Sequence, residues 1–81
     1  MLPFDIDRVH VYVSKHFRNT WMRKGDWDQT DLREALRDVF RASRVGMGRW
    51  EIFVPKRGHK KLVIAYDAEY DEVFVITGSE G

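Results

Sequence analysis

Residues 62–77 read LVIAYDAEYDEVFVIT and contain two apolar runs on either side of a polar segment. The runs, Leu62–Tyr66 and Val73–Thr77, are rich in β-branched and aromatic residues, which favour strands. The short segment Asp67–Asp71 between them predicts a turn, so the two strands are expected to be antiparallel. Consecutive positions of both runs are apolar, which indicates that hydrophobic side chains emerge on both faces of this hairpin.

A third strand is predicted just before the hairpin. Its evidence is an alternation of two sets of side chains, Trp50, Ile52 and Val54 against Arg49, Glu51 and Phe53. Residues 55–59 are expected to form the connecting turn, in which Gly58 can adopt a positive φ. Three strands joined by short turns form an antiparallel meander.

The amino-terminal half predicts a strand followed by a helix. Arg8–Val13 alternates with period two and contains Val and Tyr, so it favours a first strand. Ser14 is a suitable N-cap for a helix that runs to about Lys24 and stops at Gly25. A helical period also fits this region, through Ile6, Val9, Val13 and Phe17.

A second helix is predicted after Asp28 or Thr30, either of which can cap it. Its apolar stripe consists of Leu32, Ala35, Leu36, Val39 and Phe40. Four arginines follow another face of the same helix and are expected to be solvated: Arg33, Arg37, Arg41 and Arg44. The helix should end at residues 45–48, which contain two glycines.

These segments predict an α+β fold with the order β-α-α-β-β-β. Both helices are expected on one face of a small antiparallel sheet. The residues expected to be buried are Leu32, Leu36, Val39, Phe40, Ile52 and Ile64. The second face should carry Val63, Ala65, Phe74 and Ile76, or their alternates. Such a face often marks a partner site, and coverage by the aliphatic stems of basic side chains is the alternative.

Length and composition limit the classes of function. The chain has 81 residues, which is one domain (1–81), and 43% hydrophobic and 33% charged residues are typical of a folded protein. The absence of cysteine excludes disulfides, thiolate metal sites and cysteine nucleophiles. No apolar run is long enough to span a membrane, and Asp5 and Asp7 are unlike a signal peptide. We therefore expect a cytoplasmic protein with no membrane association.

Charge is unevenly distributed along the chain. Residues 41–61 contain seven basic side chains and one acidic, whereas residues 62–81 contain five acidic and no basic side chains. The basic segment can attract phosphates while the acidic remainder limits non-specific binding. A scattered, solvated set of cations is the alternative interpretation.

Several short motifs, in their order and spacing, resemble the small RelE/BrnT-like toxin proteins. The motifs are Ser14-Lys15-His16, Arg23-Lys24-Gly25, Thr30-Asp31-Leu32, Lys61–Asp67 and Val75-Ile76-Thr77. The resemblance covers about Val13 to Thr77. It implies a compact RNase-toxin fold, and members of that group include ribonucleases that cleave mRNA and are neutralised by an antitoxin. His16, Arg23 and Thr77 match positions of the pattern.

Metal-independent RNA cleavage requires a base, an acid and a cation beside the phosphate, and the chain offers candidates for each. His16 and His59 are candidates for the proton transfers because the pKa of histidine lies near neutrality. Arg23 is a candidate to stabilise the transition state. The candidates for phosphate binding flank the glycine turn: Lys56, Arg57, Lys60 and Lys61. No metal or cofactor is required by this scheme. A capping His16, a solvated turn around His59 and an Arg23 that serves the helix dipole remain alternatives.

Two hypotheses of different classes follow. The first is a toxin of a toxin–antitoxin pair, an endoribonuclease whose partners are RNA (ribosome-associated mRNA included) and an antitoxin protein. The second is a non-catalytic module of the same fold that binds RNA or protein, including a second copy of the chain as a homodimer. They differ in whether His16, Arg23 and His59 converge in the fold.

Overall fold

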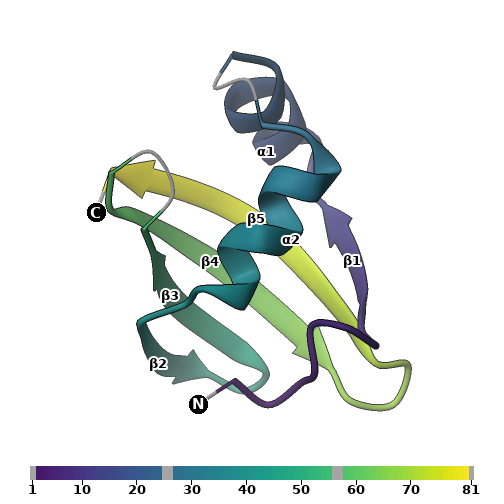
Figure 1. The fold of residues 1–81 in the computed structure, drawn as a ribbon. Coiled ribbons are helices and arrows are strands. Elements are labelled where there is room, and N and C mark those ends of the chain that lie inside the picture. Colours follow the sequence, from purple (N-terminus) through teal and green to yellow (C-terminus); the bar gives the residue numbers. More distant parts are fainter. Residues whose placement is uncertain (1, 25–26, 56–57, 81) are drawn as a thin grey trace.

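The computed structural model describes residues 2–24, 27–55 and 58–80 and has the expected α+β class. In chain order its elements are β1 (His10–Val13), α1 (Lys15–Phe17), the π-helical η1 (Arg18–Met22), α2 (Gln29–Arg37), β2 (Arg41–Gly46), β3 (Arg49–Val54), β4 (Lys60–Asp67) and β5 (Glu72–Glu80). The helices lie on one side of the sheet, with α2 running across it (Figure 1). Gly25, the predicted stop of the first helix, lies outside the described residues, as do Lys56 and Arg57.

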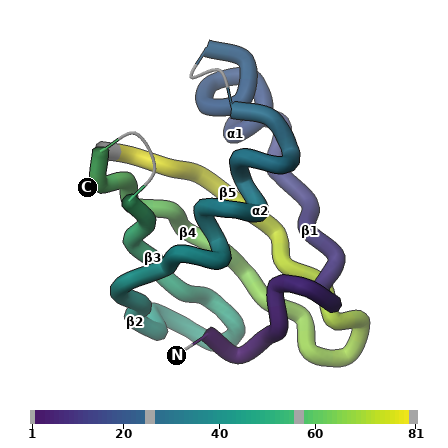
Figure 2. Tube along the Cα trace, in the orientation of Figure 1, coloured from purple at the N-terminus to yellow at the C-terminus, as the bar shows by residue number. Residues whose placement is uncertain are grey.

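The sheet has five strands in the order β1-β5-β4-β3-β2. The meander β3-β4-β5 is antiparallel as predicted, and β2 extends it by a further antiparallel strand. The first strand pairs parallel to the last, with Val11 opposite Val73, so the two ends of the chain supply neighbouring strands (Figure 2). The expectation of a purely antiparallel sheet is therefore wrong at this pair, because the three antiparallel connections from β2 to β5 leave β5 running in the direction of β1.

The second helix is shorter than predicted, and the strand β2 takes its last part. The helix ends at Arg37, and the backbone N–H of Phe40 already donates to the carbonyl of Phe53 at 3.0 Å. Arg41 and Arg44 consequently lie on a strand and share no helix face with Arg33. Phe40 is 53% exposed, so its predicted burial is wrong, and Val39 is only half-buried. Local helical spacing was misleading because residues 41–46 pair with β3, and such long-range pairing overrides a local helical pattern.

The carboxyl end belongs to the sheet as well. The last predicted strand ended at Thr77, but residues 78–80 continue β5 and pair with the start of β4. The indole of Trp21 lies on Gly78, whose carbonyl accepts from Nε1 at 3.1 Å. A Cβ at Gly78 would lie 3.1 Å from the indole and 3.0 Å from Leu62, so this close approach requires glycine.

One hydrophobic core lies between the sheet and the helices. Its buried residues are Val9, Phe17, Trp27, Leu32, Ala35, Leu36, Ile52, Val54, Leu62, Ile64, Val73 and Val75. Burial of Leu32, Leu36, Ile52 and Ile64 is confirmed, which means that the predicted phase of α2 is correct over its own length. Three aromatic rings, Phe17, Trp21 and Trp27, pack with centroids 6.0–6.4 Å apart and join the helical segments.

Both predicted helix caps are present. The Ser14 hydroxyl accepts from the backbone N–H of Phe17 at 3.0 Å and donates to the carbonyl of Ile76 at 2.6 Å. It therefore links the start of α1 to β5. Asp28 and Asp31 form a reciprocal capping box at α2, with bonds of 2.8 and 3.1 Å.

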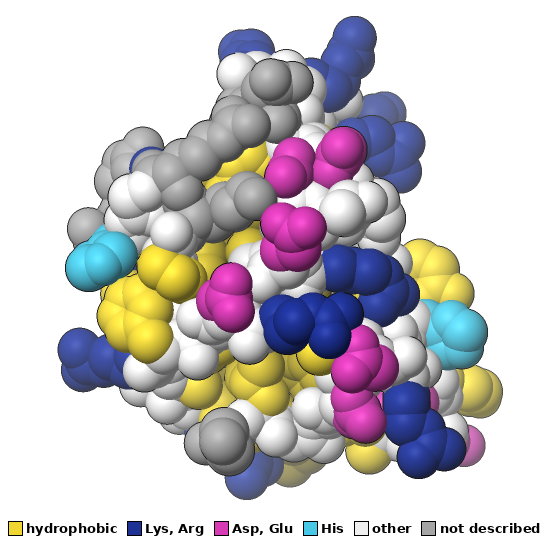
Figure 3. Space-filling model, in the orientation of Figure 1, with side chains coloured by type: hydrophobic (Ala, Val, Ile, Leu, Met, Phe, Trp, Pro, Cys, Tyr) yellow, Lys and Arg dark blue, Asp and Glu magenta, His cyan; other side chains and the backbone are white. Residues whose placement is uncertain are grey.

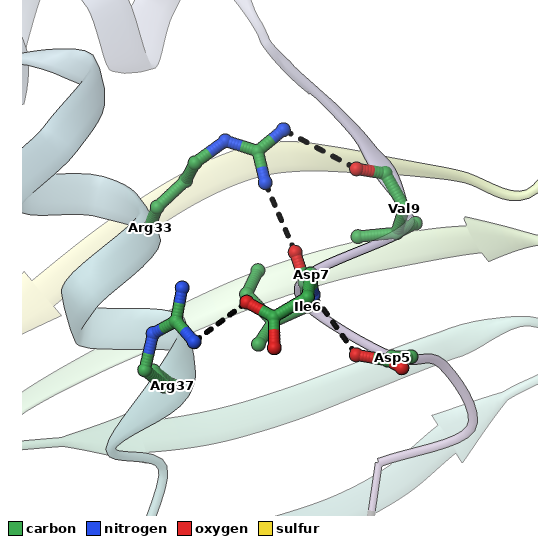
Figure 4. A network of polar contacts seen from close by, with 6 residues as sticks. All are labelled: Asp5, Ile6, Asp7, Val9, Arg33 and Arg37. Carbon is green, nitrogen blue, oxygen red and sulfur yellow. Dashed lines mark hydrogen bonds and ion pairs between the residues drawn. The ribbon is translucent and has the colours of Figure 1, made fainter.

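Two arginines of α2 hold the amino-terminal segment against the helix (Figure 4). Arg33 donates to the carbonyls of Ile6 and Val9 at 3.0 and 3.2 Å. Arg37 forms an ion pair of 2.6 Å with Asp7. The expectation of a solvated arginine face is thus wrong for Arg33, which is half-buried and bonded to the backbone of residues 6–9, whereas Arg37 is exposed as expected.

On the α2 side of the molecule, acidic and basic side chains are intermixed (Figure 3). This view therefore shows no single-sign surface around α2. No helix within the described ranges is both long enough and apolar enough to cross a membrane.

Candidate nucleic-acid interface

The predicted catalytic residues lie on separate elements. His16 is exposed on α1, and Arg23 is exposed directly after η1. His59 is exposed just before β4, where its ring lies 5.0 Å from the ring of Phe40. Among the described residues, no hydrogen bond or ion pair connects any two of these three side chains.

Sheet geometry separates the two histidines. Helix α1 packs against β5, whereas the Phe40 ring that His59 contacts precedes β2, at the far edge of the sheet. The backbone of His59 directly precedes β4, which pairs with β5, so it is the His59 side chain, turned toward Phe40, that lies away from α1. An acid and a base that act on one phosphate must both come within hydrogen-bond reach of it. The structure brings both histidines to the same end of the sheet and does not bring them into contact.

The two lysines at the start of β4 point to opposite faces. Lys60 lies on the helix side, where its Nζ is 5.9 Å from the centroid of the Trp21 ring. Lys61 lies on the other side, with its Nζ 3.9 Å from a carboxylate oxygen of Glu51. Side chains alternate along a strand, so Lys60 and Lys61 point to opposite faces of the sheet and do not form one phosphate-binding surface.

The sheet face opposite the helices, here called the open face, combines aromatic and basic side chains. Its residues alternate with the buried ones along each strand, and the strand register arranges them in three rows. These rows are Arg41, Phe53, Lys61 and Ser79; then Ser43, Glu51, Val63 and Thr77; then Arg49, Ala65, Phe74 and Tyr12.

The aromatic rings of the open face are accessible. Tyr12 is 50% and Phe74 43% exposed, and they are direct neighbours in the pairing of β1 with β5. Phe53 is half-buried, and the Arg41 guanidinium lies over its ring at 5.5 Å. Cations and aromatic faces are therefore interleaved on one surface, which is the arrangement that single-stranded nucleic acids bind. Of the apolar side chains expected on this second face, Val63, Ala65 and Phe74 lie there, whereas the register shift of β5 places Thr77, not Ile76, opposite Val63.

A cavity of about 350 Å³ lies at one end of the open face. Its lining includes Tyr12 and Phe74, the small side chain of Ala65, the cation Arg49 and two carboxylates, Asp67 and Glu72. Met47, 94% exposed, stands at its edge. A second cavity, about 470 Å³, lies on the helix side between the amino-terminal segment and β2, and is lined by Phe4, Leu36 and Val39 among others.

Tyr66 stabilises the β4–β5 turn, which lies at the acidic end of the open face. Its hydroxyl donates to Asp71 at 2.8 Å, and this hydrogen bond, with desolvation and the nearby negative charges, raises the pKa of Tyr66 above its usual value. Asp71 itself has φ 53°, in the left-handed region that Asp and Asn tolerate better than most residues. Asp67 accepts from two backbone N–H groups of the same turn.

Sequence reasoning grouped the basic residues by their position in the chain and so missed the open face. Tyr12, Arg41 and Arg49 were not among the predicted site residues, although they share a surface with Lys61. The signal that could have separated Lys60 from Lys61 was the strand assignment itself, because consecutive residues of a strand point to opposite faces. Arg41 could not have been found in this way, because its segment was predicted to be helical.

No protein-family model, curated protein or solved structure matches this chain.

Proposed function

We propose that the chain binds single-stranded RNA on the open face of its sheet and acts as a binding module. The observation that carries the proposal is the pair of exposed neighbouring rings, Tyr12 and Phe74, beside the cation Arg49. Every base has a π-face that can stack on such a ring. Lys61 and Arg41, two rows away, are placed to contact phosphates.

The geometry favours a single strand over a duplex. Rings on a sheet can stack only on bases that are unpaired and turned outward, and these occur in single strands, loops and ends. Duplex recognition depends instead on cations that follow two backbones across a groove. On the open face, Glu51 lies between the basic row and the aromatic row, so the cations do not form a continuous track.

Substitution of Phe74 tests the stacking surface. Phe74→Ala should weaken binding of a fluorescently labelled single-stranded RNA by about 1–3 kcal/mol, the range for loss of one base–aromatic stack. Tyr70→Ala is the matched control, since Tyr70 is 63% exposed on the β4–β5 turn and lies outside the three rows. Fluorescence anisotropy measures both. Equal losses in the two variants would contradict a specific role for the open face.

A second candidate function is the endoribonuclease toxin that the RelE-like resemblance implies. The contact of Lys60 with Trp21 favours it, because this contact places the basic β3–β4 end beside the helical segment that precedes Arg23. In that mechanism cations neutralise the phosphate while His16 and His59 transfer protons. Replacing both histidines by alanine should leave RNA binding intact and reduce turnover by about 10²–10⁴-fold. Cleavage that survives the double substitution contradicts the assignment of these two residues.

A protein partner is the other candidate occupant of the open face, either a copy of the chain or an antitoxin segment. Exposed Phe74 and Tyr12 are the apolar contacts that such a partner would cover. Sedimentation at several protein concentrations measures self-association. Competition between RNA and a co-expressed acidic partner for the same surface then distinguishes the two occupants.

A further inference from the structure

We infer that the cavity at the acidic end of the open face is a guanine pocket, which selects a G in the RNA strand. The inference rests on the proposed RNA-binding function and adds to it the identity of one base. The cavity volume of about 350 Å³ is near the lower end of the range of about 300–1,000 Å³ that small-molecule sites occupy.

The pocket provides a flat apolar surface for a base. Phe74 and Tyr12 supply the aromatic faces, and Ala65, opposite Phe74 in the strand register, leaves room between Arg49 and Phe74. The exposed thioether of Met47 stands at the edge, where it can close over a bound ring. These groups hold any base and do not by themselves distinguish G from A.

Discrimination comes from Glu72. Glu72 is half-buried and lines the pocket, and its carboxylate makes no hydrogen bond or ion pair with another described residue. By contrast, the other carboxylate of the lining, Asp67, already accepts two backbone N–H groups of the turn. With respect to the described residues, Glu72 therefore presents two oxygens that can accept hydrogen bonds from a ligand.

Among the four bases, guanine matches a carboxylate. Its Watson–Crick edge carries two adjacent donors, N1–H and the N2 amino group, which both oxygens of one carboxylate can accept. Adenine and cytosine present one donor beside a ring-nitrogen acceptor, and uracil presents one donor between two carbonyls. Each of these leaves a carboxylate oxygen facing an acceptor.

Arg49 lies where the other edge of the guanine would be. It is two strand spacings from β5, roughly 10 Å, and lines the opposite side of the same pocket. A guanidinium is the common partner of guanine O6 and N7. A base held between Glu72 and Arg49 thus has acceptors facing the cation and donors facing the anion.

The test measures binding of short oligouridine strands that carry one central G, A, C or U. We expect the native protein to prefer the strand with G by about ten- to a hundredfold over the strand with A. Glu72→Gln should reverse the order toward A, because a glutamine amide offers one acceptor and one donor, as adenine does. Glu69→Gln is the matched control, since Glu69 is exposed on the β4–β5 turn just before Glu72 and does not line the pocket.

Free guanosine monophosphate distinguishes the source of the base. We expect it to compete much more weakly than the strand, because it lacks the neighbouring phosphates that reach Lys61 and Arg41. Competition as strong as that of the strand would overturn the RNA version in favour of a nucleotide site.

The remaining outcomes separate this inference from the proposed function. Equal binding of all four strands, with a loss in Phe74→Ala, leaves the stacking surface intact and overturns the guanine pocket. A G preference that persists in Glu72→Gln overturns the role of Glu72. Absence of binding to every strand overturns both proposals. Circular dichroism of each variant shows that the fold is retained.

Discussion

Leu36 is a single residue on which the packing of α2 depends. It is 1% exposed and lies in the core between the helix and the sheet. Leu36→Ala should lower the free energy of unfolding by about 2–5 kcal/mol, because it removes buried methyl groups and leaves a cavity. Denaturant unfolding measures this change. Met47→Ala is the control: Met47 is 94% exposed, so its replacement should stay within about 0.5 kcal/mol of the native protein.

The hydrogen bond between Tyr66 and Asp71 predicts a pH dependence. It raises the pKa of Tyr66 in the folded protein above the ordinary value of 10.0. The proton is therefore held more tightly in the folded than in the unfolded state, and the stabilisation is fully present below the unfolded pKa. It is lost as pH rises through the higher, folded pKa.

Comparison with Tyr66→Phe isolates this contribution, because the variant keeps the ring contact with Phe4 and lacks the hydroxyl. The difference in unfolding free energy between the two proteins should be constant up to about pH 10 and shrink above it. A difference that grows with alkaline pH would contradict the sign of the pKa shift.

At the scale of elements, the sequence predicts caps, turns and strands that depend on neighbouring residues. It misses elements that depend on pairing with residues far along the chain. Ser14 and Asp28 were identifiable as caps because a cap acts on its own next turn. The meander was identifiable because the alternation of β3, the β-branched and aromatic runs of β4 and β5, and the short turns are local as well. The strand β2 was not, since RASRVG has little strand propensity and is held by its pairing with β3.

The candidate site was less predictable than the fold for the same reason. The basic segment was visible in the composition, yet the face on which each cation lies depends on strand register. Lys61 and Arg41 share a row only because β2 pairs with β3. The neighbouring rings of Tyr12 and Phe74 arise from the parallel pairing of β1 with β5, which brings together residues far apart in the chain.

The attachment of η1 to β5 is testable at one glycine. Gly78→Ala places a methyl group within 3.0–3.2 Å of Leu62 and the Trp21 indole, so η1 must move. We expect a loss of stability of about 1–3 kcal/mol, as for other overpacked sites. Gly46→Ala on β2 is the matched control, since its added Cβ would meet only Arg49, at 3.7 Å. Thermal unfolding of the two variants in parallel shows whether the effect is specific to position 78.

At the scale of the whole molecule, the two ends of the open face carry opposite charges. Lys61 and Arg41 lie in the row at one end, whereas Asp67 and Glu72 lie at the end of the β4–β5 turn. A bound strand is therefore expected to place phosphates near the first end and bases near the second. This orientation follows from Coulomb attraction and repulsion of the phosphates, so it is sensitive to salt.

The salt dependence of RNA binding distinguishes the two faces of the molecule. Each phosphate contact contributes about 0.7 to the slope of log K against log salt concentration for a single strand. Lys61→Gln should reduce the slope by about 0.7, because Lys61 lies on the open face. Lys60→Gln should leave it nearly unchanged, because Lys60 lies on the helix side over Trp21. The two variants remove the same charge from adjacent positions, so each is the control for the other. Equal reductions of the slope in the two variants would show that RNA wraps around the β3–β4 end of the sheet rather than lying on the open face. A slope near zero in the native protein would exclude phosphate contacts as the source of affinity.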